Sequence, residues 1–222
     1  MIFLYACRPQ PERPEVELKT IEVGDYIFDF PSDFELITEK GIDSYVGKIK
    51  GDSMQFGFDY GYYSNSLGKT LTEFLLDSQW KYNLPHLFMK EGITYDHTNM
   101  PKVTILQVRS ATSKDSIVGN GCDYVATCEH DKVKFDYAIY IPENIKNMNF
   151  YIDTVDNQCR KITWAKDSHK GLTGIYIKDI NGFNTSINNY LALSMATSDL
   201  SKEQQEIALK ILKSARRKRE SK

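Results

Sequence analysis

The chain has 222 residues, of which 41% are hydrophobic and 26% are charged, so it can bury a sizeable core without a disulfide or a metal ion. Its 28 Lys and Arg residues against 30 Asp and Glu residues leave a net charge of -2, which gives no general attraction to a polyanion, and nucleic acid is not an expected partner. No stretch in the middle of the chain has the composition of a linker, so we expect a single domain over residues 20–222.

The first seven residues are apolar and end in a cysteine. They read MIFLYAC, with Leu4 three positions before Cys7 and the small residue Ala6 directly before it. This pattern resembles a lipobox, the end of a bacterial lipoprotein signal, and the resemblance implies cleavage before Cys7 and acylation of its sulfur. Residues 1–7 would then be the remnant of a longer signal. The alternative is an apolar N-terminus that is not processed.

Residues 8–19 contain three prolines among charged side chains. Such a composition stays extended and cannot bury itself, which is typical of a tether that holds a domain away from a surface. The alternative is a frayed terminus with no such role. No run in the chain approaches the roughly 18 apolar residues that span a bilayer, so we expect any membrane attachment to go through a lipid.

From Ile21 onward the hydrophobic pattern has a period of two, which is typical of strands. Tyr26, Phe28 and Phe30 share one face of a strand that Pro31 ends, because proline cannot donate to a ladder. Two further strands over residues 42–50 and 54–60 are joined by a short Gly-Asp-Ser turn, which predicts antiparallel pairing.

A helix is expected to begin after Thr70, because Glu73 stands three residues later and completes a capping box, and to end near Asn83. Residues 85–101 look irregular. The second half returns to short strands separated by turn residues, over 103–109, 123–128, 133–141, 150–155, 161–165, 173–180 and 190–196.

The last predicted element is a helix capped by Ser201 and Gln204. Its apolar stripe consists of Ile207, Ala208, Ile211, Leu212 and Ala215. Six basic residues crowd its end, and we interpret them as a solvated tail outside the fold, with attraction to anionic lipid as the alternative. Together the elements predict an α+β fold, a mainly antiparallel β-sheet with one mid-chain helix and a C-terminal helix packed on it.

Three cysteines follow Cys7 in the sequence. Cys122 and Cys128 would lie about 20 Å apart on an extended strand, too far for a disulfide. Cys128 with Cys159 is the most plausible bridge, and three free thiols are the alternative. Cys128 and His130 could begin a soft-metal site, but no spacing supplies the other ligands, so we expect neither a metal nor a cofactor.

Two other groups of residues could carry function. Tyr60, Tyr62 and Tyr63, with Trp80, could stack on a sugar or a peptide, although strand tyrosines packed on a neighbouring helix are the simpler interpretation. His130, Asp131 and His169 could form a dispersed enzymatic site, but no nucleophile elbow, phosphate loop or nucleotide fingerprint is present. We therefore assign no catalytic residue.

Two passages carry a family resemblance. Residues 30–34 (FPSDF) with 39–49 (EKGIDSYVGKI), and residues 173–177 (TGIYI) before the terminal helix, are similar to uncharacterised lipoproteins of Bacteroidetes-type bacteria. The resemblance implies a lipid anchor in the cell envelope and an envelope protein or glycan as partner, or a cytoplasmic location if the lipobox interpretation fails. The element order also loosely resembles the PsbP-type α/β/α sandwich, an analogy of fold alone. The leading hypothesis is a non-enzymatic envelope lipoprotein that binds another component or stabilises an assembly.

Overall fold

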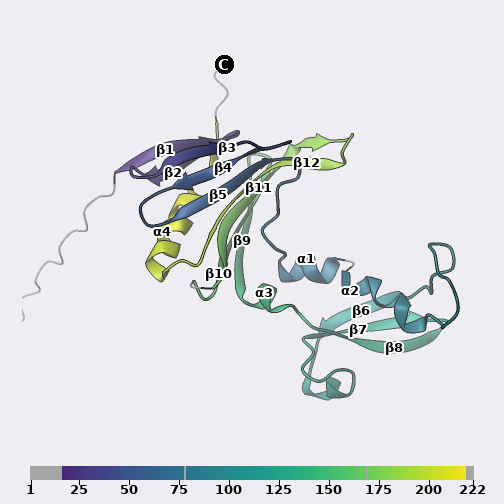
Figure 1. The fold of residues 1–222 in the computed structure, drawn as a ribbon. Coiled ribbons are helices and arrows are strands. Elements are labelled where there is room, and N and C mark those ends of the chain that lie inside the picture. The colour runs from purple at the N-terminus through teal and green to yellow at the C-terminus, as the bar shows by residue number, and fades with distance from the viewer. Residues whose placement is uncertain (1–16, 78, 169, 219–222) are drawn as a thin grey trace, which may run out of the picture.

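The largest element of the fold is an antiparallel sheet of seven strands. The computed structural model describes residues 17–77, 79–168 and 170–218, and the strands run in the order β3-β4-β5-β12-β11-β10-β9 (Figure 1). They are β3 (Glu35–Glu39), β4 (Tyr45–Lys50), β5 (Gln55–Gly61), β9 (Met148–Val155), β10 (Gln158–Ala165), β11 (Leu172–Asn184) and β12 (Asn189–Ser198). In the sheet β5 lies beside β12, and the chain between β5 and β9 contributes no strand to this sheet.

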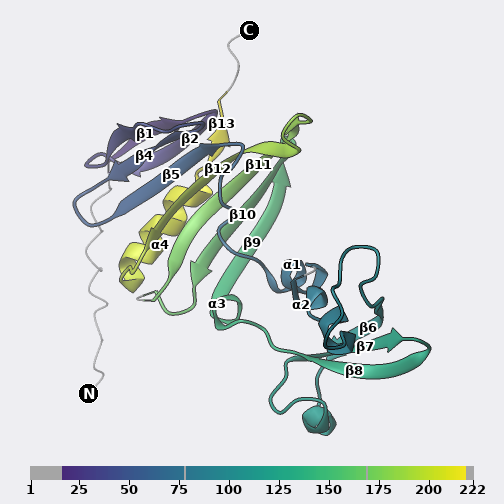
Figure 2. The ribbon, with the colours of Figure 1, turned by 45° about the vertical axis from the view of Figure 1, so that its right-hand side comes forward.

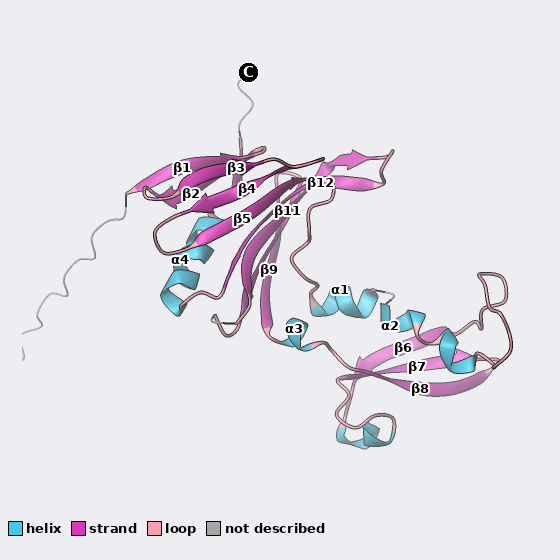
Figure 3. Cartoon of the chain, in the orientation of Figure 1, coloured by secondary structure: helices cyan, strands magenta, loops and turns pink. Residues whose placement is uncertain are grey.

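One face of the seven-stranded sheet is covered by the C-terminal helix and by a smaller sheet (Figures 1 and 3). The helix is α4 (Lys202–Lys213), and the smaller sheet consists of β1 (Leu18–Val23), β2 (Tyr26–Pro31) and β13 (Arg216–Arg217). Ser201 and Gln204 cap α4 reciprocally, as predicted. Ile211 and Leu212 are buried as the stripe predicts, whereas Ile207 is exposed at its margin.

The core between these layers is rich in aromatic rings. Phe28 and Phe30 are fully buried on β2, as the alternation predicts. The Phe30 ring lies 5.2 Å from that of Phe34 and 5.6 Å, edge to face, from that of Phe56 on β5. Burial of such rings contributes about 1.5–3 kcal/mol each, so this cluster fixes the small sheet on the large one.

Arg216 and Arg217, the first two basic residues after α4, are part of the fold, which corrects the prediction of a solvated tail for them. Arg216 and Arg217 pair with β2 as strand β13. Arg216 binds Asp29 with two hydrogen bonds of 2.8 Å, and Arg217 binds the buried Asp179 at 3.1 Å. The pattern of charges could not distinguish this arrangement from a free tail, because the acidic partners come from distant strands.

The segment between β5 and β9 forms a second lobe with its own sheet and its own hydrophobic cluster (Figure 2). The sheet has the order β6-β7-β8, and the segment that returns from it to β9 carries the short helix α3. The elements of this part are α1 (Leu71–Leu76), α2 (Gln79–Tyr82), the 3-10 helices η1 (Pro85–Phe88) and η2 (Ser113–Ile117), β6 (Thr104–Ser110), β7 (Tyr124–His130), β8 (Val133–Ile139) and α3 (Glu143–Lys146). Phe74, Trp80 and Leu84 pack against this sheet and are buried with Ala126 and Ile139. The expectation of a single domain over residues 20–222 stays a prediction.

The α+β class and the mainly antiparallel sheet are confirmed, and several boundaries differ from the predicted ones. The predicted tether over residues 8–19 overlaps β1, which begins at Leu18. Strand β3 was not predicted, because all five of its residues are exposed and no alternation marks it. The expected helix from Thr70 to Asn83 ends at Leu76, and α2 is a separate turn. Among the described residues no helix is long and apolar enough to cross a membrane.

Candidate functional site

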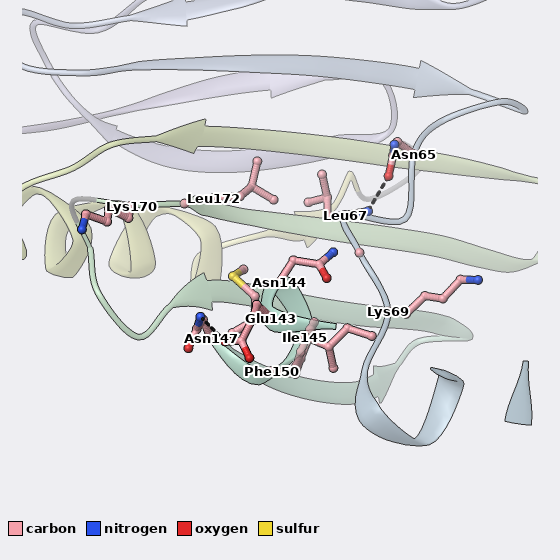
Figure 4. Close-up of a pocket in the computed structure, with 13 residues that line it drawn as sticks. Asn65, Leu67, Lys69, Glu143, Asn144, Ile145, Asn147, Phe150, Lys170 and Leu172 are labelled. Atoms are coloured by element: carbon pink, nitrogen blue, oxygen red, sulfur yellow. Dashed lines mark hydrogen bonds between the residues drawn. The ribbon is translucent and has the colours of Figure 1, made fainter. Parts of the chain in front are cut away.

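A hollow lies where the chain leaves the main sheet for the second lobe and returns from it. This interlobe cavity has a volume of about 560 Å³. Its walls come from four segments: residues 65–69 of the outgoing connection, residues 143–147 at α3, the start of β9, and residues 170–172 at the start of β11 (Figure 4). The cavity therefore touches both connections between the lobes.

The apolar part of the cavity lining, called its floor below, consists of Leu67, Ile145, Met148, Phe150 and Leu172. Ile145 belongs to the hydrophobic cluster of the second lobe, whereas Phe150 and Leu172 lie on strands of the main sheet. A smaller cavity of about 380 Å³ adjoins it and shares Ile145, Met148 and Phe150. These three residues therefore line both cavities.

Leu67 reaches the floor through an unusual backbone turn. Its φ is 56°, in the left-handed region that costs a side-chain-bearing residue roughly 1–2 kcal/mol. The Asn65 side-chain oxygen accepts a 2.8 Å hydrogen bond from the Leu67 N–H, and Gly68 continues the turn with φ 87°. A Cβ at Gly174 on β11 would lie 2.7 Å from the Leu67 side chain, so the missing side chain leaves room for Leu67 on the sheet.

The polar part of the lining, called the rim below, carries three amides, those of Asn65, Asn144 and Asn147. The Asn147 amide donates to Glu143 at 3.2 Å, and the Lys69 ammonium is paired with Asp77. Lys170 is exposed, and its ammonium makes no ion pair within the described part of the chain. The side chain of Asn144 likewise has no hydrogen-bond partner among the described residues. An amide and a cation at the rim are therefore available to a ligand.

An ion pair between a buried lysine and a half-exposed glutamate fixes the outgoing connection to the main sheet. Lys161 on β10 is 4% exposed, and its ammonium donates to the Gly68 carbonyl at 2.8 Å and lies 3.3 Å from both carboxylate oxygens of Glu73. Glu73 also completes the capping box of α1, where it accepts from the Thr70 N–H at 2.6 Å. Partial burial alone would raise the pKa of Glu73, but the Thr70 N–H and the Lys161 ammonium hold this pKa below its ordinary value. The contact joins the cavity wall, α1 and the sheet.

The tyrosines and tryptophan considered for stacking do not form one surface. Tyr60 is partly buried against the main core, with its ring 6.2 Å from that of Tyr26 and edge to face. Burial and a hydrogen bond with Asp25 hold the pKa of Tyr60 well above its usual range. Tyr63 is exposed, whereas Trp80 is buried in the second lobe and stacked on Tyr137. The structure thus divides these rings between the two lobes.

His130 and Asp131 lie at the tight turn between β7 and β8, away from the cavity. Nδ1 of His130 is 2.9 Å from the Lys102 carbonyl oxygen, and its ring lies 4.0 Å from that of Phe88. Asp131 is 3.5 Å from His130 Nε2, and His169 lies outside the described residues. Among the residues that the structure describes, no cluster of three potential metal ligands occurs.

The three cysteines within the described residues are free thiols. Cys122 and Cys128 are not bridged, as predicted, although Cys122 lies in the turn before β7 and not on the strand. The suggested bridge between Cys128 and Cys159 is wrong, because Cys128 belongs to the second lobe and Cys159 to β10 of the main sheet. Burial raises the pKa of the Cys128 thiol, which favours its inert, protonated form. Cys7 lies outside the described residues.

The sequence pattern does not single out the cavity residues, although Asn65 stands two positions after Tyr63. Their spacing carries no signal, because four distant segments contribute a few residues each. What the site offers chemically is an apolar floor with amide groups and a cation at its rim, which is typical of binding sites for small molecules or peptide side chains. Comparison with known proteins finds no family model and no curated protein that matches the chain.

Proposed function

We propose that this chain is a non-enzymatic binding module, held at the cell envelope by a lipid on Cys7, and that its ligand occupies the interlobe cavity. The observation that carries the binding role is an apolar floor beneath an amide and a cation that no described residue engages. The cavity volume falls in the usual range for ligand sites, roughly 300–1,000 Å³. The envelope location is supported by the lipobox-like residues Leu4 to Cys7.

The chemistry of the lining defines the class of ligand. Phe150 and Leu172 favour an apolar group, because covering them removes hydrocarbon surface from water. Lys170 favours an anionic group at the rim, and Asn144 can donate to it and accept from it. We therefore expect an amphipathic ligand, an apolar group joined to a carboxylate or another anion.

Binding of a simple probe tests this proposal. Anilinonaphthalene sulfonate combines apolar rings with an anion, so it should bind at one saturable site on the folded protein. Lys170→Glu reverses the charge at the rim, and we expect the dissociation constant to rise about fivefold. Lys213→Glu, at an exposed position on α4, is the matched control and should leave binding unchanged. Fluorescence titration measures both.

The same titration can contradict the binding role. Binding that does not saturate, or that weakens equally in the two charge variants, would mean that the probe adheres to the surface in general. Near-ultraviolet circular dichroism of each variant ensures that the compared proteins share the same packing, because the probe also binds partly unfolded chains.

The lipid anchor has its own test. Expressed together with its natural upstream sequence, the wild-type chain should fractionate with membranes, and Cys7→Ser should move it to the soluble fraction, because the acylated sulfur is lost. Cys122→Ser is the matched control and should stay with the membranes. Identical fractionation of wild type and Cys7→Ser would contradict the anchor without affecting the cavity.

A further inference from the structure

Strand β9 forms an open edge of the main sheet. It pairs with β10 on one side, and no strand within residues 17–77, 79–168 and 170–218 pairs with its other side. α4 lies on one face of the sheet, while the second lobe lies off the opposite face beyond the lower ends of the strands (Figures 1 and 2). The outer backbone groups of β9 are therefore accessible to another strand.

This edge lacks the usual protection against pairing. Natural edge strands are kept apart by charges, proline or short length. β9 has eight residues and one charged side chain, Asp153, which Arg160 of β10 neutralises with a 2.8 Å hydrogen bond from Nε and a second bond from the guanidinium. The opposite edge, β3, has five residues and a glutamate at each end. The two edges thus differ in the feature that discourages association.

The unpaired edge strand β9 also exposes apolar side chains. Tyr151 is 50% exposed and Ile152 is 51% exposed, on opposite faces of the strand. Val155 is also exposed near its end. Covering these side chains on both faces would add apolar burial to the new backbone hydrogen bonds.

We propose that β9 pairs antiparallel with β9 of a second copy of this chain, about a two-fold axis at Tyr151. In this register Tyr151 faces its own counterpart, Phe150 faces Ile152, and Asn149 faces Asp153. Apolar residues meet apolar residues and an amide meets a carboxylate, twice over by symmetry. Centring the axis on Ile152 instead would place Tyr151 opposite Asp153 and Asn149 opposite Val155.

The geometry of this pairing also closes the assembly. A two-fold axis perpendicular to the sheet keeps α4 of both copies on the same face, and the two seven-stranded sheets become one continuous sheet. The remaining outer edges are then both β3, with Glu35 and Glu39 exposed at its ends. Further addition of copies is discouraged, so the product is a dimer and not a fibre.

Sedimentation of the full chain tests the dimer. Wild type should sediment as a dimer at micromolar concentrations, and Ile152→Lys should raise the dimer dissociation constant roughly a hundredfold, because two unpaired ammonium groups enter the interface. Ile37→Lys is the matched control: Ile37 is 45% exposed on the opposite edge strand, and this variant should remain a dimer. Equal thermal midpoints of the monomeric forms exclude misfolding as the cause.

Cross-linking tests the register. In the proposed pairing residue 151 faces itself, so Tyr151→Cys should form a disulfide-linked dimer under mild oxidation, whereas Thr154→Cys, which faces Met148, should not. A wild-type chain that is monomeric at about 100 µM, or that forms open-ended aggregates, would overturn the proposal. A dimer unaffected by Ile152→Lys would overturn it as well. Met148 and Phe150 of β9 also line the interlobe cavity, so the dimer is measured without a cavity ligand.

Discussion

Replacing Trp80 with alanine is expected to destabilise the second lobe by about 3–5 kcal/mol, the usual cost of truncating a buried tryptophan. Trp80 is 7% exposed and stacks on Tyr137, and its indole N–H donates to the Leu75 carbonyl at 3.4 Å. The cluster around it shares no member with the main core. We therefore expect the loss to stay largely within the second lobe.

The two tryptophans of the chain make this measurable, because the other one, Trp164, packs against the main core. In Trp80→Ala, Trp164 fluorescence should report a nearly unchanged unfolding midpoint, while hydrogen exchange at Val125 and Ala126 on β7 accelerates. Ile211→Ala in α4 should give the reverse pattern, at a cost of about 2–5 kcal/mol to the main core. If Trp164 fluorescence and hydrogen exchange on β7 report the same loss of stability in Trp80→Ala and in Ile211→Ala, the two lobes unfold as one unit.

The second large effect is expected from Glu73→Gln, at about 2 kcal/mol. This variant keeps the shape of the side chain but leaves the Lys161 ammonium, buried at 4% exposure, with the Gly68 carbonyl and no counter-charge. Removing one partner of a fully buried pair typically costs about 3–5 kcal/mol, and the half-exposed Glu73 carboxylate reduces that figure here. Lys161→Met, which removes the buried charge itself, should cost less.

The effect of Glu73→Gln should depend on pH. Because the folded pKa of Glu73 is lowered, the stabilisation is complete above the unfolded pKa of about 4.3 and is lost as the pH falls through the folded pKa. Denaturant unfolding should therefore show a wild-type advantage at pH 7 that shrinks below about pH 4. Glu35→Gln on the exposed strand β3 provides the comparison. If the difference in unfolding free energy between wild type and Glu73→Gln is constant from pH 7 to pH 3, the stabilisation does not come from the charge of Glu73.

The strands and helices that the sequence predicts best are those whose burial is set locally. Phe28 and Phe30 alternate with half-buried residues, and Ser201 with Gln204 forms a complete cap, so local patterns identify β2 and α4. Strand β3 is exposed throughout and is held by pairing with β4 alone, which leaves no pattern to find. Strand β13 depends on contacts of Arg216 and Arg217 with distant carboxylates, which charge counting cannot locate.

The candidate site was less predictable than the fold, for a physical reason. Its floor requires Leu67 in a left-handed turn seated over Gly174, more than a hundred residues away in the chain. In the sequence Phe150 and Leu172 have the pattern of ordinary strand residues. They line a cavity only because the connection over residues 65–69 lies next to them in the fold. Tyr60 and Tyr63 precede Asn65 of the cavity wall in the chain, but the Tyr60 ring packs against the main core and Tyr63 is exposed.

The most direct test of the binding role is photo-crosslinking from within the interlobe cavity. Replacing Leu172 on the floor with p-benzoylphenylalanine and irradiating membranes from the native organism should yield one discrete ligand adduct, identified by its mass. The same photoreactive residue at Leu76, which is exposed on α1, should not yield that adduct, and Lys170→Glu should reduce it at position 172. No adduct at position 172, or the same adducts at both positions, would contradict a ligand site between the lobes.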